Sequence, residues 1–343
     1  MRIATAAALV AVAALTATSV SSANSTRAAA PAAKAATLRI GLVTDIGGLN
    51  DRSFNHLAYL GLQEAQKKLG VQVKVLQSKS GSDYIPNLST LAAQHYDLVI
   101  AVGFLMGDAV KAVSKQFSST KFAIIDVDPA GADGKNVLGL TFHEEESGYV
   151  AGYLAGLMQK VTGPRNNGKN VVSTVGGLKI PPVDHYIAGF QAGAKAASPG
   201  VKTLNGYSNS FTDAAKCKSL AQTQLAQGSD VVFAVAGGCG LGALSAANAK
   251  GVWGVGVDAD QNYLGDYMLT SAVKKVDFAV YSTVFKLKEG IFPGGTTVTF
   301  GIKNFAAGIS GYSKEVPGAV KTKVNAIISK IKAGGIKIPN TVK

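Results

Sequence analysis

The sequence has few of the residues that usually carry out chemistry. Its 343 residues include 2 cysteines and 4 histidines, and the histidines (His56, His95, His143 and His185) show no H-x-x-x-H spacing. No Gly-x-Ser-x-Gly nucleophile elbow is present either. Aspartates at predicted strand ends have the chemistry for acid–base catalysis, but no nucleophile or metal-ligand set accompanies them. We therefore predict a binding protein rather than an enzyme, with no cofactor and no metal site.

Two glycine-rich segments resemble nucleotide-binding motifs without meeting all of their requirements. GPRNNGK (residues 163–169) nearly matches a P-loop, but Asn170 replaces the Ser or Thr, and a predicted strand follows the segment instead of preceding it. GCGLGA (residues 238–243) follows a predicted strand, opens a helix and has Asp258 at the next strand end, as in a dinucleotide-binding fingerprint. A dinucleotide fingerprint belongs to the first strand–helix unit of its lobe, and this segment lies in the third. An NAD-dependent α/β enzyme is therefore kept only as an alternative.

The apolar run at the N-terminus is short and is built largely from alanine. It ends near Thr18 and is followed by Ser/Ala-rich sequence with small-x-Ala cleavage sites at Ala23 or near Ala35. We predict that residues 1–36 are a cleaved secretory signal and leader rather than a membrane anchor. No cysteine lies near these sites, so lipid attachment through an N-terminal cysteine is not predicted and the mode of surface retention stays open.

Acidic residues are few, with 21 against 34 lysines and arginines, which gives a formal net charge of +13. Without residues 1–36 the counts are 31 basic and 21 acidic residues, or +10. The lysines are dispersed, with seven between Lys314 and Lys343, and no basic cluster alternates with aromatic residues. This pattern is typical of a solvated surface, so nucleic acid is not a predicted partner.

Cys217 and Cys239 are the only cysteines. An even count in an exported chain permits a disulfide, and closing a loop of this length stabilises by ~3 kcal/mol in the chain-entropy model. We predict that the two are bridged, and a pair of buried free thiols is the alternative.

The segment LRIGLVTDIGGLNDRSFNHLAYLGLQEAQKKL (residues 38–69) is the most informative part of the sequence. An apolar run is followed by a glycine-containing loop and then by apolar residues at helical spacing. This predicts the first βα unit of an open α/β sheet, in which the strand-end loops form the ligand crevice. Phe54 lies on the first helical turn, where it either packs inward as a hydrophobic staple or presents its ring to a flat ligand.

Strand and helix periods alternate along the chain, which predicts doubly wound parallel sheets. A strand–helix–strand unit from Asp97 to Asp126 is echoed from Asp230 to Asp258, at spacings of 29 and 28 residues. Both copies carry a glycine-containing loop and an Asp-x-Asp at the last strand end. We therefore predict two similar α/β lobes with a cleft between them.

The sequence resembles the basic membrane protein family of ABC-transporter substrate-binding proteins, the group that contains the purine nucleoside receptors. The resemblance covers residues 38–310 and is carried by VTDIGGLNDRSFN, HEEESGYVAGYLAG, SDVVFAVAGGCGLGAL, WGVGVDAD and LTSAVKKVD. It implies the type I periplasmic-binding-protein fold, in which two Rossmann-like lobes joined by three crossings close on a ligand. We expect residues 37–142 and 264–290 in the N-terminal lobe, and residues 143–263 and 291–343 in the C-terminal lobe.

The resemblance also implies a nucleoside site. The positions that match the family's site are Asp45, Phe54, Asn55, Asp128, Phe211, Gly237, Gly238, Asp258 and Lys274. Two phenylalanines suit stacking on a purine, and Asp258 and Lys274 are expected to face the ribose hydroxyls from different lobes. The implied function is delivery of a purine nucleoside to an ABC permease by an exported, membrane-associated monomer. A sugar or another small flat metabolite is the alternative ligand, because sugar sites also combine aromatic rings with Asp and Asn.

Overall fold

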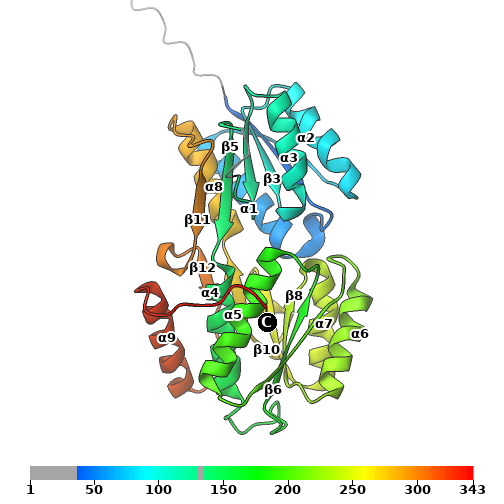
Figure 1. Ribbon diagram of the computed structural model, residues 1–343, viewed down its shortest axis with the longest axis vertical. Coiled ribbons are helices and arrows are strands. Elements are labelled where there is room, and N and C mark those ends of the chain that lie inside the picture. Colours follow the sequence, from blue (N-terminus) through cyan, green and yellow to red (C-terminus); the bar gives the residue numbers. More distant parts are fainter. Residues whose placement is uncertain (1–36, 130–133, 343) are drawn as a thin grey trace, which may run out of the picture. The chain divides into compact units, whose positions relative to one another are not determined.

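The computed structural model describes residues 37–129 and 134–342. These residues form two β-sheets of mostly parallel strands, and helices cover both faces of each sheet (Figure 1). This confirms the predicted α/β class with two Rossmann-like lobes. The predicted leader, residues 1–36, lies outside the described residues. Among the described residues, none of the helices combines the length and the apolar character that crossing a bilayer requires.

The first sheet takes its central strands from the N-terminal part of the chain. Its strands are β1 (Arg39–Thr44), β2 (Gln72–Leu76), β3 (Leu98–Val102), β4 (Lys121–Ile125), β5 (Val137–Phe142) and β11 (Thr297–Phe300), in the order β11-β5-β4-β3-β1-β2. Helices α1 (Phe54–Leu69) and α8 (Val276–Lys288) cover one face, and α2 (Tyr84–Ala93) and α3 (Gly107–Gln116) cover the other. Because both faces are covered, the central strands are continuous apolar runs without polar alternation.

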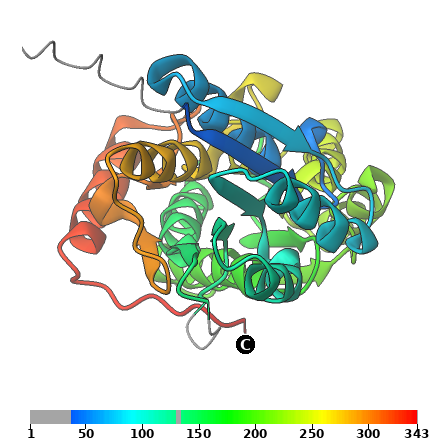
Figure 2. The same cartoon turned by 90° about the horizontal axis from the view of Figure 1, so that it is seen from above.

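The second sheet repeats this arrangement. Its strands are β6 (Val171–Gly176), β7 (Lys202–Tyr207), β8 (Val231–Val235), β9 (Trp253–Asp258), β10 (Met268–Lys274) and β12 (Ala307–Ile309), in the order β12-β10-β9-β8-β6-β7. Helices α4 (Glu144–Met158), α5 (Pro181–Ala197) and α9 (Gly318–Lys332) cover one face, and α6 (Ala214–Ala226) and α7 (Gly237–Lys250) cover the other. Helix α9 packs on α4 at the margin of this lobe, as Figure 1 and Figure 2 both show.

The chain passes between the lobes three times, as the family resemblance implies. It leaves the first lobe after β5, returns from β10 into α8, and leaves again after β11. The expected lobe boundaries were wrong for two strands, because β10 pairs with β9 in the second sheet and β11 pairs with β5 in the first. The segments 264–290 and 291–343 each hold elements of both lobes, and an apolar period does not encode which strand is the pairing partner.

Glycines set the spacing between α4 and α5. A Cβ at Gly148 would overlap the backbone oxygen of Tyr186, and a Cβ at Gly152 would overlap that of Phe190. The two helix backbones therefore approach more closely than any larger side chain would allow. This contact fixes the N-terminal ends of both helices, which lie beside the candidate site.

A disulfide joins Cys217 to Cys239, the predicted pair, whose Cα atoms are 5.6 Å apart. It ties α6 to the first turn of α7. Residues 237–240 form that first turn. Gly237 has a φ of +52°, a left-handed conformation that lets the chain pass from β8 directly into the helix.

Candidate ligand-binding site

A cavity of about 590 Å³, including the part that opens to solvent, lies at the carboxyl ends of the strands of both sheets. The first lobe contributes the loops after β1, β3 and β4, and the second lobe contributes the segments after β6, β7, β8, β9 and β10. Glycines and aliphatic side chains line much of it. Its charged, amide and aromatic lining residues are Asp45, Asp51, Phe54, Asn55, Phe104, Asp126, Tyr186, Phe211, Asp258 and Lys274. Its place at the strand ends is typical of a small-molecule site in α/β proteins.

Asp45, which follows β1, is held by a side chain from the first turn of α1. Asn55 Nδ2 donates hydrogen bonds to Asp45 Oδ1 at 2.8 Å and to Asp51 Oδ2 at 3.0 Å. The backbone N–H of Gly47 donates to the same Asp45 Oδ1 at 2.8 Å. Burial raises the pKa of Asp45 to about 6, against the opposing effect of the Asn55 and Gly47 hydrogen bonds. Asp45 is therefore an oriented carboxylate at neutral pH and becomes protonated in mild acid.

Lys274, at the end of β10, is buried and pairs with two carboxylates. Its Nζ lies 2.6 Å from Asp126 Oδ1, just after β4, and 2.8 Å from Glu144 Oε1, at the start of α4. Burial alone would lower the pKa of Lys274, but the two carboxylates raise it above its usual range, so the ammonium stays charged. The same Nζ lies 5.0 Å from the ring centroid of Phe54 and 4.9 Å from that of Phe142. Lys274 thereby positions both the Asp126 carboxylate and the Phe54 ring.

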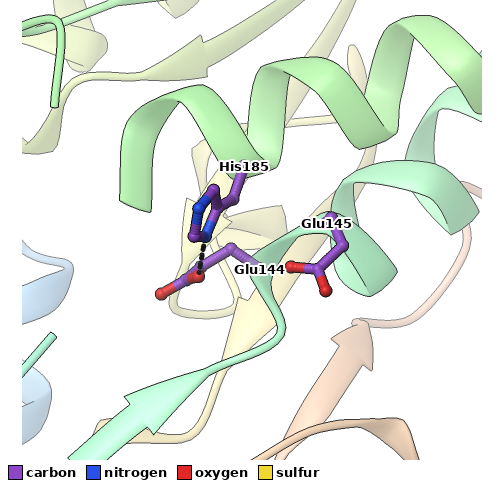
Figure 3. Close-up of side chains that lie close together, drawn as sticks. All are labelled: Glu144, Glu145 and His185. Carbon is purple, nitrogen blue, oxygen red and sulfur yellow. Dashed lines mark hydrogen bonds and ion pairs between the residues drawn. The ribbon is translucent and has the colours of Figure 1, made fainter. Parts of the chain in front are cut away.

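Glu144 extends this ion pair to a histidine on α5 (Figure 3). His185 Nδ1 lies 3.1 Å from Glu144 Oε2, and Glu145 lies beside this pair. Among the described residues, these three offer ligand atoms within 4.8 Å of one another, close enough for a metal ion. Each already has a partner, however. Lys274 neutralises Glu144, to which His185 is also paired. Glu145 Oε1 lies 2.9 Å from His143 Nδ1. We therefore assign this cluster to the ion-pair network and not to a metal.

Asp258, at the end of β9, carries a hydrogen bond between the lobes. Tyr186 of the second lobe donates from its hydroxyl to Asp258 Oδ1 at 3.1 Å. Ser53 of the first lobe donates from Oγ to Asp258 Oδ2 at 2.9 Å, and all three side chains are buried. Burial raises the pKa of Asp258, and Lys274 opposes this rise. The structure therefore has the lobes in contact across the cavity.

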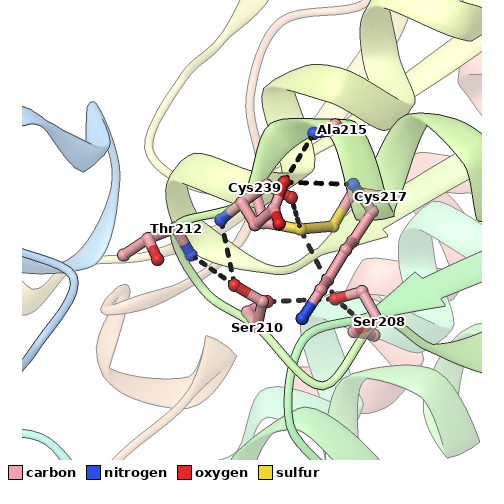
Figure 4. Close-up of a disulfide and its surroundings, with 9 residues drawn as sticks. Ser208, Ser210, Thr212, Ala215, Cys217 and Cys239 are labelled. Carbon is pink, nitrogen blue, oxygen red and sulfur yellow. Dashed lines mark hydrogen bonds between the residues drawn. A yellow bond between two sulfur atoms is a disulfide. The ribbon is translucent and has the colours of Figure 1, made fainter.

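Phe211, in the loop between β7 and α6, supplies the aromatic part of the second-lobe wall. Its ring lies against Gly177, where a Cβ would overlap it. The backbone N–H of Cys239 donates to the Phe211 oxygen at 2.8 Å, and the disulfide to Cys217 fastens the same turn of α7 to α6 (Figure 4). Ser210 Oγ accepts two further backbone hydrogen bonds within this loop. The loop that carries Phe211 is thus tied to both neighbouring helices.

The cavity brings together most of the residues expected from the sequence. Seven of them line it: Asp45, Phe54, Asn55, Phe211, Gly237, Asp258 and Lys274. Gly238 lies one residue further along α7 and is not part of the lining. Asp128 is also outside the cavity, and its Oδ1 accepts a hydrogen bond from Thr297 Oγ1 at 2.5 Å. The residue that reaches the cavity from this segment is Asp126, so Asp126 is the candidate from this strand end in place of Asp128.

Asp126 had a signal in the sequence that was not used. The internal repeat pairs Asp126 with Asp258, and each is the first Asp of an Asp-x-Asp after a strand. In the structure both have a left-handed backbone, with φ of +69° and +61°. The expectation that Asp258 and Lys274 approach from different lobes was wrong, because Asp258 pairs with Val273 between neighbouring strands β9 and β10. Tyr186 was missed as well, since no motif distinguishes it from other aromatic residues of a helix.

Comparison with known proteins places this fold and site in a family. The sequence model of the Bmp family, described as ABC transporter substrate-binding protein PnrA-like, matches residues 39–342. The chain belongs to this family. It is therefore a substrate-binding protein of the ABC-transporter class and not an enzyme, and its family works with the permease and ATPase components of such transporters.

Individual relatives agree over nearly the whole chain. The CD4+ T-cell-stimulating antigen of Listeria monocytogenes is 36% identical over 88% of this chain and 87% of its own. The ABC transporter nucleoside-binding protein BmpA of Lactococcus lactis is 37% identical over 86% of this chain and 88% of its own. Among solved structures, an ABC transporter solute-binding protein of Aeropyrum pernix K1 superposes with a TM-score of 0.79 at 25% identity, covering 89% of this chain and 94% of that one. The solute-binding function is thus supported by sequence and by fold.

Proposed function

We propose that this protein binds a purine nucleoside in the cavity between its lobes and delivers it to an ABC permease from outside the cytoplasmic membrane, as a monomer. A relative with 37% identity carries nucleoside binding in its name. The observation that carries the proposal is the pairing of aromatic rings with buried carboxylates in one cavity. Phe54 enters from the first lobe and Phe211 from the second.

The two rings give the proposed site its affinity for a flat base. Stacking of a base on an aromatic side chain contributes ~1 to 3 kcal/mol in single-strand binding proteins, and a purine offers two faces for it. Phe54 is half-buried and lies under the Lys274 ammonium, so its ring is fixed before the ligand arrives. Phe211 is fixed by Gly177 and by the hydrogen bond from Cys239.

The carboxylates supply hydrogen-bond acceptors to the proposed nucleoside site. Asp45 and Asn55 lie on the same loop–helix turn as Phe54, which suits hydrogen bonding to the edge of a stacked base. Asp258 is our candidate acceptor for the vicinal ribose hydroxyls. Lys274 acts on the ligand through Asp126, because its ammonium is already occupied by two carboxylates. Glycine at 237 allows the backbone to come close to the sugar.

A thermal-shift panel on the purified protein tests the proposal. Inosine, guanosine or adenosine should raise the melting temperature by mass action, and NAD and arabinose should not. Phe54→Ala and Phe211→Ala should each weaken nucleoside binding by about tenfold or more, since each removes a stack worth more than ~1.4 kcal/mol. Phe305→Ala, which removes an exposed ring that is not part of the cavity lining, is the matched control.

The alternative ligands give different patterns. Stabilisation by arabinose alone would favour a sugar as the ligand. Stabilisation by NAD alone would contradict the assignment of this chain as a non-enzymatic binding protein. A 2′,3′-dideoxynucleoside should bind more weakly by about 3 kcal/mol or more, because two charge-assisted hydrogen bonds lose their donors. Equal binding of ribo- and dideoxynucleosides would exclude Asp258 as the acceptor of the ribose hydroxyls.

A further inference from the structure

The positive charge of this protein is concentrated in its last segment. Residues 290–343 contain 8 lysines, 1 glutamate and no arginine, whereas residues 37–289 contain 23 basic and 20 acidic residues. The last 54 residues therefore carry +7 of the +10 found after residue 36. The single acid of this segment, Glu315, lies 3.4 Å from Arg165 and is neutralised there.

Helix α9 is the structured centre of this segment. Its inner side buries Val320, Val324 and Ile331 against the core of the second lobe. The opposite side carries small neutral residues such as Thr322 and Ser329, which are exposed. Both views place α9 (red) at the margin of the structure, with its outer side uncovered (Figure 1, Figure 2).

Four lysines border the outer side of α9. Lys321 and Lys332 lie along one edge, and Lys323 and Lys330 along the other, as their spacing on a helix requires. The helix has no acidic residue, and in the described chain none of these four lysines forms an ion pair. Lysines on both edges of a neutral stripe can direct their ammonium groups toward one flat surface.

An exposed aromatic ring adjoins this face. Phe305 follows the short helix η5 (Ile302–Asn304), which contacts α9, and Lys332 Nζ lies 3.8 Å from the centroid of its ring. Phe305 is 67% exposed, more than any other large hydrophobic side chain of the described residues. Its φ of +61° is an unfavourable conformation for a residue with a Cβ. The chain thus holds an apolar ring in water beside a row of lysines.

We propose that the lysine-bordered side of α9, together with Phe305, is a docking surface for a bilayer that contains anionic phospholipid. Lysine ammonium groups near such a surface are attracted to lipid phosphates, and an aromatic ring enters the headgroup region. Nucleic acid is a poorer match, because this segment has no arginine for bidentate contacts and no row of aromatic residues for stacking. A substrate-binding protein of an ABC transporter works beside a membrane, so this surface would keep it near its permease.

Vesicle flotation of the full chain tests this docking surface without any nucleoside, so its result is independent of the proposed ligand. The protein should bind vesicles of phosphatidylcholine mixed with phosphatidylglycerol and should not bind vesicles of phosphatidylcholine alone. Binding should fall steeply between 0.1 and 1 M salt, where the Debye length shortens from about 10 Å to about 3 Å. Each lysine at an anionic surface raises partitioning roughly fivefold.

Matched variants locate the surface. Replacing Lys321, Lys323, Lys330 and Lys332 with glutamine should weaken binding to the mixed vesicles by about a hundredfold or more. The control replaces Lys202, Lys216, Lys218 and Lys250, which are exposed on other elements, and removes the same charge. This control variant should bind the mixed vesicles within a few fold of the unmodified protein. The double variant Lys323→Gln/Lys330→Gln serves if the quadruple variant lowers the melting temperature.

Four results would overturn the proposal. One is equal binding to neutral and anionic vesicles. Another is an equal loss of binding to the mixed vesicles in the α9 variant and the control variant. The third is displacement from the mixed vesicles by a short DNA duplex at equal phosphate concentration, which would indicate a general polyanion site. Phe305→Trp provides a local reporter, whose emission should shift to shorter wavelength on the mixed vesicles, and an unshifted emission from bound protein also refutes the assignment.

Discussion

The hydrogen bond between Ser53 and Asp258 connects the two lobes directly, so its removal tests how closure contributes to affinity. Ser53 lies at the start of α1 in the first lobe, and Asp258 ends β9 in the second. The bond is 2.9 Å long, and neither side chain is exposed beyond 7%. Ser53→Ala removes the hydroxyl and leaves Asp258 with Tyr186 as its remaining donor.

The expected size of the effect follows from the charge and burial of this bond. A hydrogen bond to a charged group contributes about 1.5 to 3 kcal/mol, and this one forms only when the lobes meet. Its loss lowers the ratio of closed to open form by about tenfold to a hundredfold. If the ligand binds the closed form, its apparent dissociation constant rises by the same factor.

Isothermal titration calorimetry with the nucleoside that gives the largest thermal shift measures this factor. Ser147→Ala is the matched control, because Ser147 is equally buried but bonds to Val273 and Gly308 within the second lobe. It should lower the melting temperature and leave affinity nearly unchanged. An unchanged affinity in Ser53→Ala, or an equal loss in both variants, would refute the role of this bond in closure.

Three further predictions concern the site and the fold. Because burial raises the pKa of Asp45 from 3.8 to about 6, the folded state holds this proton more tightly, and the free energy of unfolding should fall by ~2 kcal/mol between pH 4 and pH 6. Asp45→Asn should remove this fall in the free energy of unfolding, measured in urea at pH 4 to 6, and should weaken nucleoside binding. An unchanged pH dependence in the variant contradicts the raised pKa of Asp45. Gly152→Ala should destabilise by about 1 to 3 kcal/mol in urea unfolding, whereas Gly163→Ala, which has open space for a Cβ, should not. Thiol titration of unfolded, unreduced protein should find no free Cys217 or Cys239, and two free thiols would exclude the bridge.

Local sequence features predicted the elements of this fold well. The helix that begins at Phe54 follows from apolar residues at helical spacing and a C-terminal glycine, and the structure has it at Phe54–Leu69. The strands buried on both faces follow from continuous apolar runs. What these features do not contain is the identity of pairing partners, which is why β10 and β11 were placed in the wrong lobes. Strand pairing is a long-range property, and it is decided by the backbone of the neighbouring strand.

The site was predicted largely through the family resemblance, and its errors have a local cause. Asp126 and Asp128 stand two residues apart after the same strand, so which one faces the cavity depends on the backbone turn between them. A left-handed conformation at Asp126 makes that turn, and the only sign of it in the sequence is the internal repeat that aligns Asp126 with Asp258. The same turn at Asp258 produced no error, because only that Asp matched the family motif. Tyr186 reaches the cavity because glycines bring α5 close to α4, and such packing is not visible in a motif.

The three crossings between the lobes have a consequence for how this chain is synthesised. The first sheet is incomplete until β11 (Thr297–Phe300) has been made, and the second until β12 (Ala307–Ile309) has followed. A nascent chain that ends before residue 297 therefore leaves the edge of β5 unpaired and open to wrong partners. Both lobes become complete almost simultaneously, within the last stretch of translation, so neither is a finished folding unit while most of the polypeptide is being produced.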